Sequence, residues 1–189
     1  MCGVRIRRAD TLYGSRMDVE KAIRTRRTHK AFAATEIDRG VLEELIELAT
    51  WAPNHHLTNP WRFRVLGAET RARLMELADA SQPGSAVKLR RAPTLIAVSA
   101  AQTGDTGQDR EDLLATGVAA YLILLGAHGR GLAGYWRTVP LLDTLEGRQV
   151  LCLPAEEAPV GLLYLGWPLQ EQRVPERTPL EQGILIHLP

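Results

Sequence analysis

Residues 42–66 read LEELIELATWAPNHHLTNPWRFRVL, and the change from helix to strand inside this stretch decides the fold. Between residues 41 and 52, apolar side chains recur at the spacing of one helical face: Val41, Leu45, Leu48, Ala49 and Ala52. Asp38 is the predicted N-cap of this helix, and Pro53 is predicted to stop it. Residues 61–67 then alternate large apolar residues with arginine, which predicts a half-buried strand.

The rest of the chain continues this interleaving of helices and strands. Helices are predicted over residues 17–27, with Asp18 as N-cap, and over 69–81, 109–129 and 141–148. Strands are predicted over 93–101, 135–138 and 160–166, and a late strand over 184–188 has no obvious local partner. The pattern predicts one domain of α/β type over residues 17–189. Residues 1–16 show no periodicity and are expected to form a loosely ordered tail.

Composition narrows the class of protein. A chain of 189 residues with 45% hydrophobic and 24% charged residues is typical of a single globular domain. A net charge of +1 provides no basic surface of the kind that nucleic acid requires, so no nucleic-acid partner is expected. Cys2 and Cys152 are too few for a disulfide framework, which favours a reducing compartment and hence the cytoplasm.

Neither a membrane span nor a secretory signal is expected. The longest apolar stretch, residues 117–127, is shorter than the roughly 18 residues that a bilayer-spanning helix needs. The first residues carry arginines without a following hydrophobic region, unlike a secretory signal.

A basic cluster marks the first candidate site. Residues 24–30 read RTRRTHK, where a predicted helix ends. Guanidinium groups bind phosphate oxygens in bidentate fashion, and a threonine hydroxyl can add a donor, so the cluster suits an oxyanion. A solvated basic helix end explains the same residues.

The connector APNHH at residues 52–56 is the second candidate. Adjacent His55 and His56 point in different directions on most backbones, and neither cysteine nor carboxylate stands at ligand spacing nearby, so no metal site is expected. Pro53, Asn54 and Pro60 favour a rigid turn that fixes its donors in place. A packed connector with exposed histidines is the alternative.

The third candidate is GYWRT at residues 134–138. Arg137, beside an aromatic residue at a strand end, could serve the same anion as Arg26; alternatively Trp136 is core and Arg137 surface. The nearby glycines end a helix, whereas the Rossmann fingerprint lies between a strand and a helix start, so that fold is rejected. The chain also lacks GxSxG, P-loop and HExxH motifs, which argues against the usual classes of hydrolase and NTPase.

Taken in order, RRTHKAF, the stretch at 42–66, GYWRT and PVGLLYLGWP resemble the FMN-dependent nitroreductase family, in particular its compact single-domain bacterial members. The resemblance covers residues 17–189. It implies an α+β fold with a mostly antiparallel central sheet flanked by helices. It also implies an intertwined homodimer with FMN at the interface, in which the C-terminal strand crosses to the partner's sheet.

The same resemblance implies roles for individual residues. Arg26, Arg27 and Thr28 fall on the segment that binds the FMN phosphate and ribityl chain, and Lys30 falls where a lysine donates to the flavin N1/O2 edge. His55, with Trp51 nearby, falls where a side chain reaches the cofactor from the other subunit. Later cofactor contacts are expected from Trp136, Arg137 and Thr138. Residues 126–131 are expected to meet the nicotinamide cofactor, whereas His29 and His56 have no settled counterpart.

The implied activity is an FMN-dependent NAD(P)H oxidoreductase. It passes hydride from flavin N5 to an electron-poor small molecule, such as a nitroaromatic, quinone or enone, by a ping-pong mechanism. Because the flavin supplies the difficult chemistry, no catalytic side chain is expected. Two alternatives remain: another flavin reaction on the same fold, such as reductive dehalogenation, flavin fragmentation or azoline oxidation, or a flavin-binding protein without useful turnover.

Overall fold

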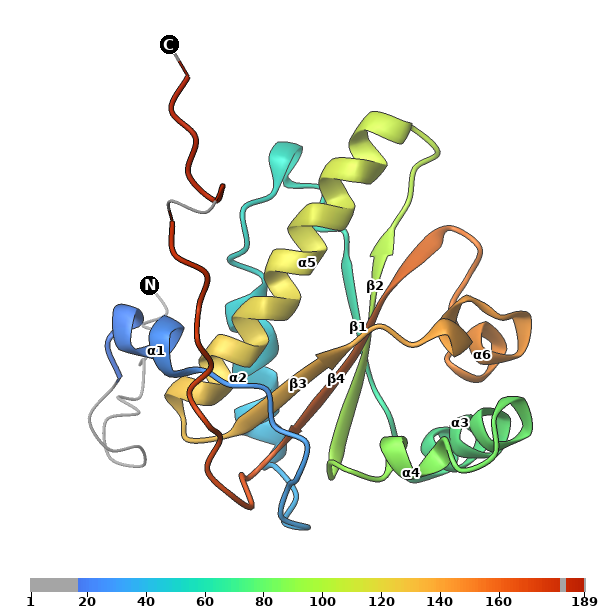
Figure 1. The fold of residues 1–189 in the computed structure, drawn as a ribbon. Helices are drawn as coiled ribbons and strands as arrows, with labels where there is room; N and C mark the ends of the chain where they lie inside the picture. The colour runs from blue at the N-terminus through green and yellow to red at the C-terminus, as the bar shows by residue number, and fades with distance from the viewer. Residues whose placement is uncertain (1–16, 181–182, 189) are drawn as a thin grey trace, which may run out of the picture.

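The computed structural model describes residues 17–180 and 183–188, so the tail expected at residues 1–16 lies outside the described residues. A four-stranded sheet runs through the middle in the order β1-β2-β4-β3 (Figure 1). Its strands are β1 (Trp61–Val65), β2 (Thr94–Ala101), β3 (Ala133–Arg137) and β4 (Glu157–Gly166). Every neighbouring pair is antiparallel. The α+β fold class, with a mostly antiparallel sheet flanked by helices, is therefore confirmed.

Helices cover both faces of this sheet. One face carries α2 (Arg39–Ala49) and the long helix α5 (Thr106–Gly129), while α3 (Ala68–Ser81), α4 (Ala86–Leu89) and α6 (Leu145–Val150) lie on the other (Figure 1). The short helix α1 (Val19–Thr25) packs against α5. Two 3-10 turns, η1 (His55–Leu57) and η2 (Pro140–Asp143), complete the described elements. The helices therefore form a layer on each side of the sheet.

The sheet has two apolar faces because successive side chains of a strand point to opposite sides. Ile96 and Leu163 face α2 and α5, whereas their neighbours Leu95 and Leu162 belong to the opposite core. Because β2 and β4 are buried on both faces, their sequences are continuous apolar runs without polar alternation.

The two predicted N-caps are confirmed, and the predicted stop of α2 at Pro53 is wrong. Asp18 accepts a hydrogen bond from the Lys21 amide, and Asp38 accepts from the Gly40 amide. However, α2 ends at Ala49, and Thr50 caps it by donating to a carbonyl of the last turn, so Pro53 lies beyond a turn rather than at the helix end. Sequence spacing located the helix but not its final turn.

Two later elements also differ from expectation. The predicted helix over 141–148 is split at Thr144, whose hydroxyl accepts from the Gly147 amide and so starts α6. Residues 184–188 form no strand within the part of the chain that the structure describes, and their side chains are exposed. Exchange of this segment with a partner chain therefore stays a prediction.

Helix α5 extends well beyond the apolar run at 117–127 and begins at Thr106, three residues before the predicted start at Asp109. Among the described residues it is the one helix whose length and composition would allow it to cross a membrane. Its inner face lies against the sheet, where Ala119, Ala120 and Ile123 are fully buried. A core helix meets the same criterion, and α5 packs as one.

Candidate active site between α5 and the sheet edge

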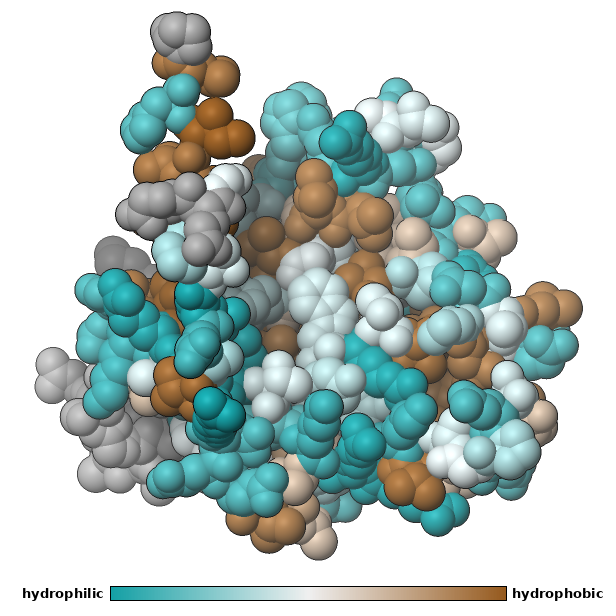
Figure 2. All heavy atoms as spheres, viewed as in Figure 1, coloured by the Kyte–Doolittle hydropathy of each residue, from teal (hydrophilic) through white to brown (hydrophobic). Residues whose placement is uncertain are grey.

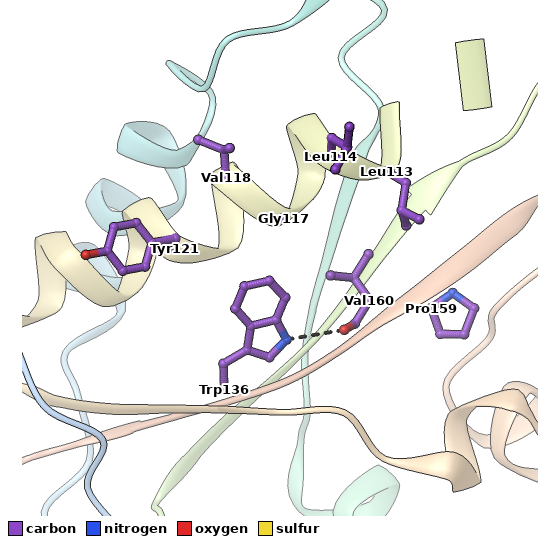
Figure 3. Close-up of a pocket in the computed structure, with 8 residues that line it drawn as sticks. All are labelled: Leu113, Leu114, Gly117, Val118, Tyr121, Trp136, Pro159 and Val160. Atoms are coloured by element: carbon purple, nitrogen blue, oxygen red, sulfur yellow. Dashed lines mark hydrogen bonds between the residues drawn. The ribbon is translucent and has the colours of Figure 1, made fainter. Parts of the chain in front are cut away.

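An apolar hollow of about 630 Å³ lies where α5 crosses the ends of β3 and β4 (Figure 3). Eight residues line it: Leu113, Leu114, Gly117, Val118, Tyr121, Trp136, Pro159 and Val160. Its volume lies within the roughly 300–1,000 Å³ typical of small-molecule and cofactor sites. Figure 2 shows hydrophobic side chains gathered on this face of the molecule. The hollow is therefore suited to a flat, largely apolar group.

Trp136 is fixed within this hollow. Its indole Nε1 donates to the carbonyl of Val160 at 3.2 Å (Figure 3). Gly161 permits this approach, because a Cβ there would lie 2.7 Å from both the indole Nε1 and the Arg137 carbonyl oxygen. Gly161 also has φ +143°, which favours glycine. The backbone of β4 is thus shaped around the tryptophan ring.

A cationic segment, residues 26–29, runs beside β3, the strand that carries Trp136. After α1 ends at Thr25, Arg26 leaves the helical conformation, with ψ 130°. The chain then runs beside β3, where Thr28 forms a parallel bridge with Gly134 and the His29 amide donates to the Gly134 carbonyl at 3.1 Å. These two contacts set the arginines against α5 at the edge of the sheet.

Tyr121 connects the cationic segment to the hollow. The Arg26 guanidinium carbon lies 5.7 Å from the centroid of the Tyr121 ring, within range of a cation–π contact. The same ring lines the hollow near Trp136 (Figure 3). The cationic segment and the apolar hollow therefore meet at Tyr121.

The cationic segment has donors that the described residues do not use. Arg26 Nε, Arg27 Nε and His29 Nδ1 are buried without a hydrogen-bond partner there. Arg27 spends one terminal nitrogen on the Arg24 and Arg26 carbonyls. Within residues 17–180 and 183–188, no carboxylate forms an ion pair with either arginine. Spare positive charge and unused donors are what an anionic ligand requires.

Two histidines lie among these arginines. Thr25 Oγ1 and His128 Nε2, at the end of α5, are 2.8 Å apart. Burial lowers the pKa of His128, and the nearby positive charge of Arg26, His29 and Arg27 lowers it further. Burial and Arg26 lower the pKa of His29 in the same way. Both rings are therefore biased towards the neutral form.

The connector at residues 52–60 lies at the other end of α5 and satisfies its own polar groups. His55 Nδ1 is 2.7 Å from Glu111 Oε2, and the two histidine rings stack with centroids 3.8 Å apart. Thr58 donates to the buried Asp112 carboxylate at 2.5 Å, and Gln108 donates to the same oxygen at 3.0 Å.

This connector keeps an unusual backbone conformation. His56, Leu57 and Asn59 all have φ near +50°, in the left-handed region that costs a non-glycine residue free energy. The Asn54 side chain accepts from the Asn59 amide and donates to the Thr58 hydroxyl, which fixes the turn. The rigid turn expected from the prolines and Asn54 is present, and its histidines are exposed.

The structure brings together only part of the expected site. Arg26 and Trp136 both lie beside Tyr121, and Thr28 pairs with Gly134 on the strand that carries Trp136. His55 lies apart from them: at 1.5 Å per residue, its partner Glu111 is about 15 Å along α5 from Tyr121.

The other expected residues stand apart from the hollow. The Tyr135 and Tyr164 rings lie 5.3 Å apart on the α3 side of the sheet, and Arg137 shares that side because strand residues alternate. Burial raises the pKa of Tyr164, and Arg137 partly offsets this. Lys30 and Thr138 are exposed, and Trp51 is 80% exposed.

Sequence reasoning missed Tyr121, and it included His128 only within residues 126–131, which were expected to meet the nicotinamide cofactor and not the cationic segment. Leu114, Val118 and Tyr121 recur at helical spacing on the outward face of α5, where Leu114 is 64% exposed. The signal in the sequence was an outward apolar stripe on a helix whose inner face is also apolar.

Comparison with known proteins places the chain in a family. The sequence model described as the Nitroreductase family matches residues 23–88 and 75–167. A provisionally named NADH dehydrogenase/NAD(P)H nitroreductase of Methanothermobacter thermautotrophicus is 27% identical, over 89% of each chain. The 5,6-dimethylbenzimidazole synthase of Rhodospirillum rubrum is 28% identical, over 80% of this chain and 82% of that protein.

A solved structure has the same fold. A provisionally assigned nitroreductase from Desulfovibrio desulfuricans, solved in complex with FMN, superposes with a TM-score of 0.76 at 23% identity. The match covers 93% of this chain and 99% of the other. The family match spans most of the described chain, and the fold agrees with it. The chain belongs to the nitroreductase family.

Proposed function

We propose that the protein is an FMN-dependent NAD(P)H oxidoreductase that reduces an electron-poor small molecule. One observation carries the proposal: Tyr121 links a cationic segment with unused buried donors to an apolar hollow that contains Trp136. FMN combines a phosphate dianion with a flat ring system, and these two halves match the two parts of the site. Family membership and the FMN complex of the Desulfovibrio protein support this cofactor.

The residues of the cationic segment would bind the phosphate end. Arg26 and Arg27 each offer a guanidinium group without an ion-pair partner in residues 17–180 and 183–188, and Thr28 adds a hydroxyl. Trp136, fixed by its hydrogen bond to Val160, would supply a wall against the ring. Arg137 and Thr138, expected on the same strand, stay predictions because Arg137 faces the opposite core.

When bound, FMN would accept hydride from NAD(P)H and deliver it to a nitroaromatic, quinone or enone in a ping-pong cycle. Lys30 is exposed and forms no hydrogen bond within the described residues, which leaves its ammonium available for the N1/O2 edge of the flavin. A fixed cation there stabilises negative charge that develops during reduction. Replacing Lys30 with alanine is therefore expected to slow reduction by NAD(P)H more than it weakens FMN binding. Equal reduction rates in the two proteins would remove this role.

We further propose that the working unit is a homodimer in the cytoplasm. Ile186 and Leu188 in the C-terminal segment are 72% and 85% exposed, and α5 presents Leu114 to the outside. The sheet has two edge strands, β3 and β1, and Thr28 and His29 occupy part of the outer edge of β3. Residues 184–188 of a partner chain would therefore pair with the outer edge of β1. A dimer would also bring the His55 and Trp51 of one chain towards the cofactor of the other. Light scattering of the full chain and of a chain ending at residue 182 tests this assembly.

A second flavin reaction has a specific observation in its favour. The similarity to 5,6-dimethylbenzimidazole synthase, at 28% identity, is as high as that to the nitroreductase-named relative. Simple hydride transfer remains the better proposal, because the hollow is an open apolar slot whose lining carries few polar groups that could select one specific substrate.

One experiment separates these possibilities. The purified protein is loaded with FMN, freed of air and mixed with NADH or NADPH while flavin absorbance is followed. Loss of the yellow colour, and its return on addition of a nitroaromatic or quinone, is the expected result. Colour that persists with both nucleotides would favour a binding protein without turnover. Failure of the protein to bind FMN at all would overturn the proposal.

A further inference from the structure

We propose that His29 and His128 make FMN binding proton-linked: the histidine pair takes up protons when the phosphate group enters the cationic segment. This inference rests on the proposed function, because it concerns the phosphate end of the same site. It gives His29 a role and adds a residue from α5 to the segment at residues 26–29.

The geometry places both rings within one cationic cluster. His29 is fixed by its amide bond to Gly134, and its Nδ1 is buried without a partner among the described residues. His128 lies at the end of α5, where Nε2 and the Thr25 hydroxyl are 2.8 Å apart. Among the described residues, neither ring is paired with a carboxylate that would hold it in the protonated form.

The charged groups around the pair are mostly positive. Arg26, from the segment after α1, acts on both rings, and His29 and Arg27 also act on His128. The nearby carboxylates serve other cations, since Glu20 pairs with Arg24 on α1 and Glu44 pairs with Arg130 after α5. In the part of the chain that the structure describes, no carboxylate pairs with either histidine.

A phosphate dianion changes this balance. Burial first, and then the arginine charges, lower the pKa of both histidines in the protein without ligand. A bound dianion offsets the arginine charges and attracts a proton to each ring, so the pKa of the pair rises. Whenever the bound state has the higher pKa, binding takes up protons and affinity increases as pH falls.

The phosphate group itself would act in the opposite direction. Its second pKa is about 6, so binding by arginines favours release of its proton below that pH. At pH 7.5 the free phosphate is already almost entirely the dianion. Net uptake measured there therefore reports on the protein and not on the ligand.

Calorimetry of FMN binding to the flavin-free protein tests the inference. Titrations at pH 7.5 in buffers of different ionisation enthalpy give the number of protons taken up. We expect net uptake with FMN, and an affinity that increases as pH falls from 8.5 to 6.5, at most about tenfold per pH unit for each proton. Riboflavin, which lacks the phosphate, is expected to bind without this uptake.

Variants assign the uptake to the pair. His29→Asn and His128→Asn are each expected to reduce it, and the double variant to abolish it. His56→Asn removes a histidine that stacks on His55 at the far end of α5, so uptake is expected to be unchanged there. Uptake that survives in the double variant, or is lost in the His56 variant, would overturn the assignment.

The unmodified protein alone can also overturn the inference. FMN binding without net proton uptake, or equal uptake with FMN and riboflavin, would remove the proton linkage and leave the proposed oxidoreductase intact. No FMN binding by the flavin-free protein would remove both.

Discussion

Polar side chains cluster near both ends of α5, but near one end they lack hydrogen-bond partners among the described residues and near the other they are paired. At its C-terminal end, Arg26, Arg27 and His29 keep buried nitrogens without partners in residues 17–180 and 183–188. At its N-terminal end, His55 pairs with Glu111, and Asp112 accepts from two side chains. Buried polar groups are normally paired within the protein, so a cluster of unpaired ones points to a ligand. We therefore propose that the first end receives an anion, whereas the side-chain bonds at the second end fix the connector.

The largest expected effect tests the anion site directly. Arg26→Ala removes a charge-assisted donor from the proposed phosphate contact, which is worth about 1.5–3 kcal/mol. FMN affinity is expected to fall roughly 10- to 150-fold. Arg24→Ala is the matched control, because Arg24 is exposed and already pairs with Glu20. Fluorescence titration of both variants checks this, and equal affinities would break the contrast between the two ends.

The next effect tests the N-terminal end of α5, where the polar side chains are paired within the protein. Asp112→Ala leaves the hydroxyl of Thr58 and the amide of Gln108 without their acceptor, at a cost of about 1–3 kcal/mol in the free energy of unfolding. Urea denaturation measures the loss. FMN affinity of the folded variant is expected to change far less than in Arg26→Ala. A large loss of FMN with unchanged stability would mean that the connector belongs to the cofactor site of its own chain.

The smallest effect is a dependence of stability on pH, because both histidines remain partly exposed. Their pKa values lie below the ordinary value of about 6.5, so the unfolded chain binds more protons than the folded one. Stability of the flavin-free protein is therefore expected to fall as pH decreases below about 6.5. Bound FMN is expected to weaken this slope. Thermal melting across pH 5.5–8, with and without FMN, measures it, and a slope that is the same in His29→Asn/His128→Asn would assign it elsewhere.

Local rules predicted most of the scaffold. The aspartate caps at Asp18 and Asp38 depend only on hydrogen bonds within one turn, and the buried strands β2 and β4 depend on continuous apolar runs. The end of α2 was missed because the capping bond from Thr50 competes with continued helix, and spacing does not reveal it. The late strand predicted at 184–188 is not formed within the described residues, and its pairing with a partner chain stays a prediction.

The site was predictable only where one segment supplies it. Arg26, Arg27 and Thr28 are consecutive, so their chemistry shows in the sequence. Tyr121 and His128 join them only because α1 packs on α5, a contact between segments about a hundred positions apart in the chain. The resemblance groups Arg137 with Trp136, whereas in the structure these adjacent strand residues point to opposite faces of the sheet, so the cofactor contact of Arg137 stays a prediction.

The connector has a consequence for local opening. Three of its residues, His56, Leu57 and Asn59, occupy left-handed backbone conformations, each costing about 1 kcal/mol or more. Such a segment gains free energy when it detaches, and a few side-chain bonds to Asn54 and Asp112 oppose this. The amides of residues 56–59 are thus expected to exchange with deuterium well before those of α5, although side-chain bonds hold the turn in one conformation.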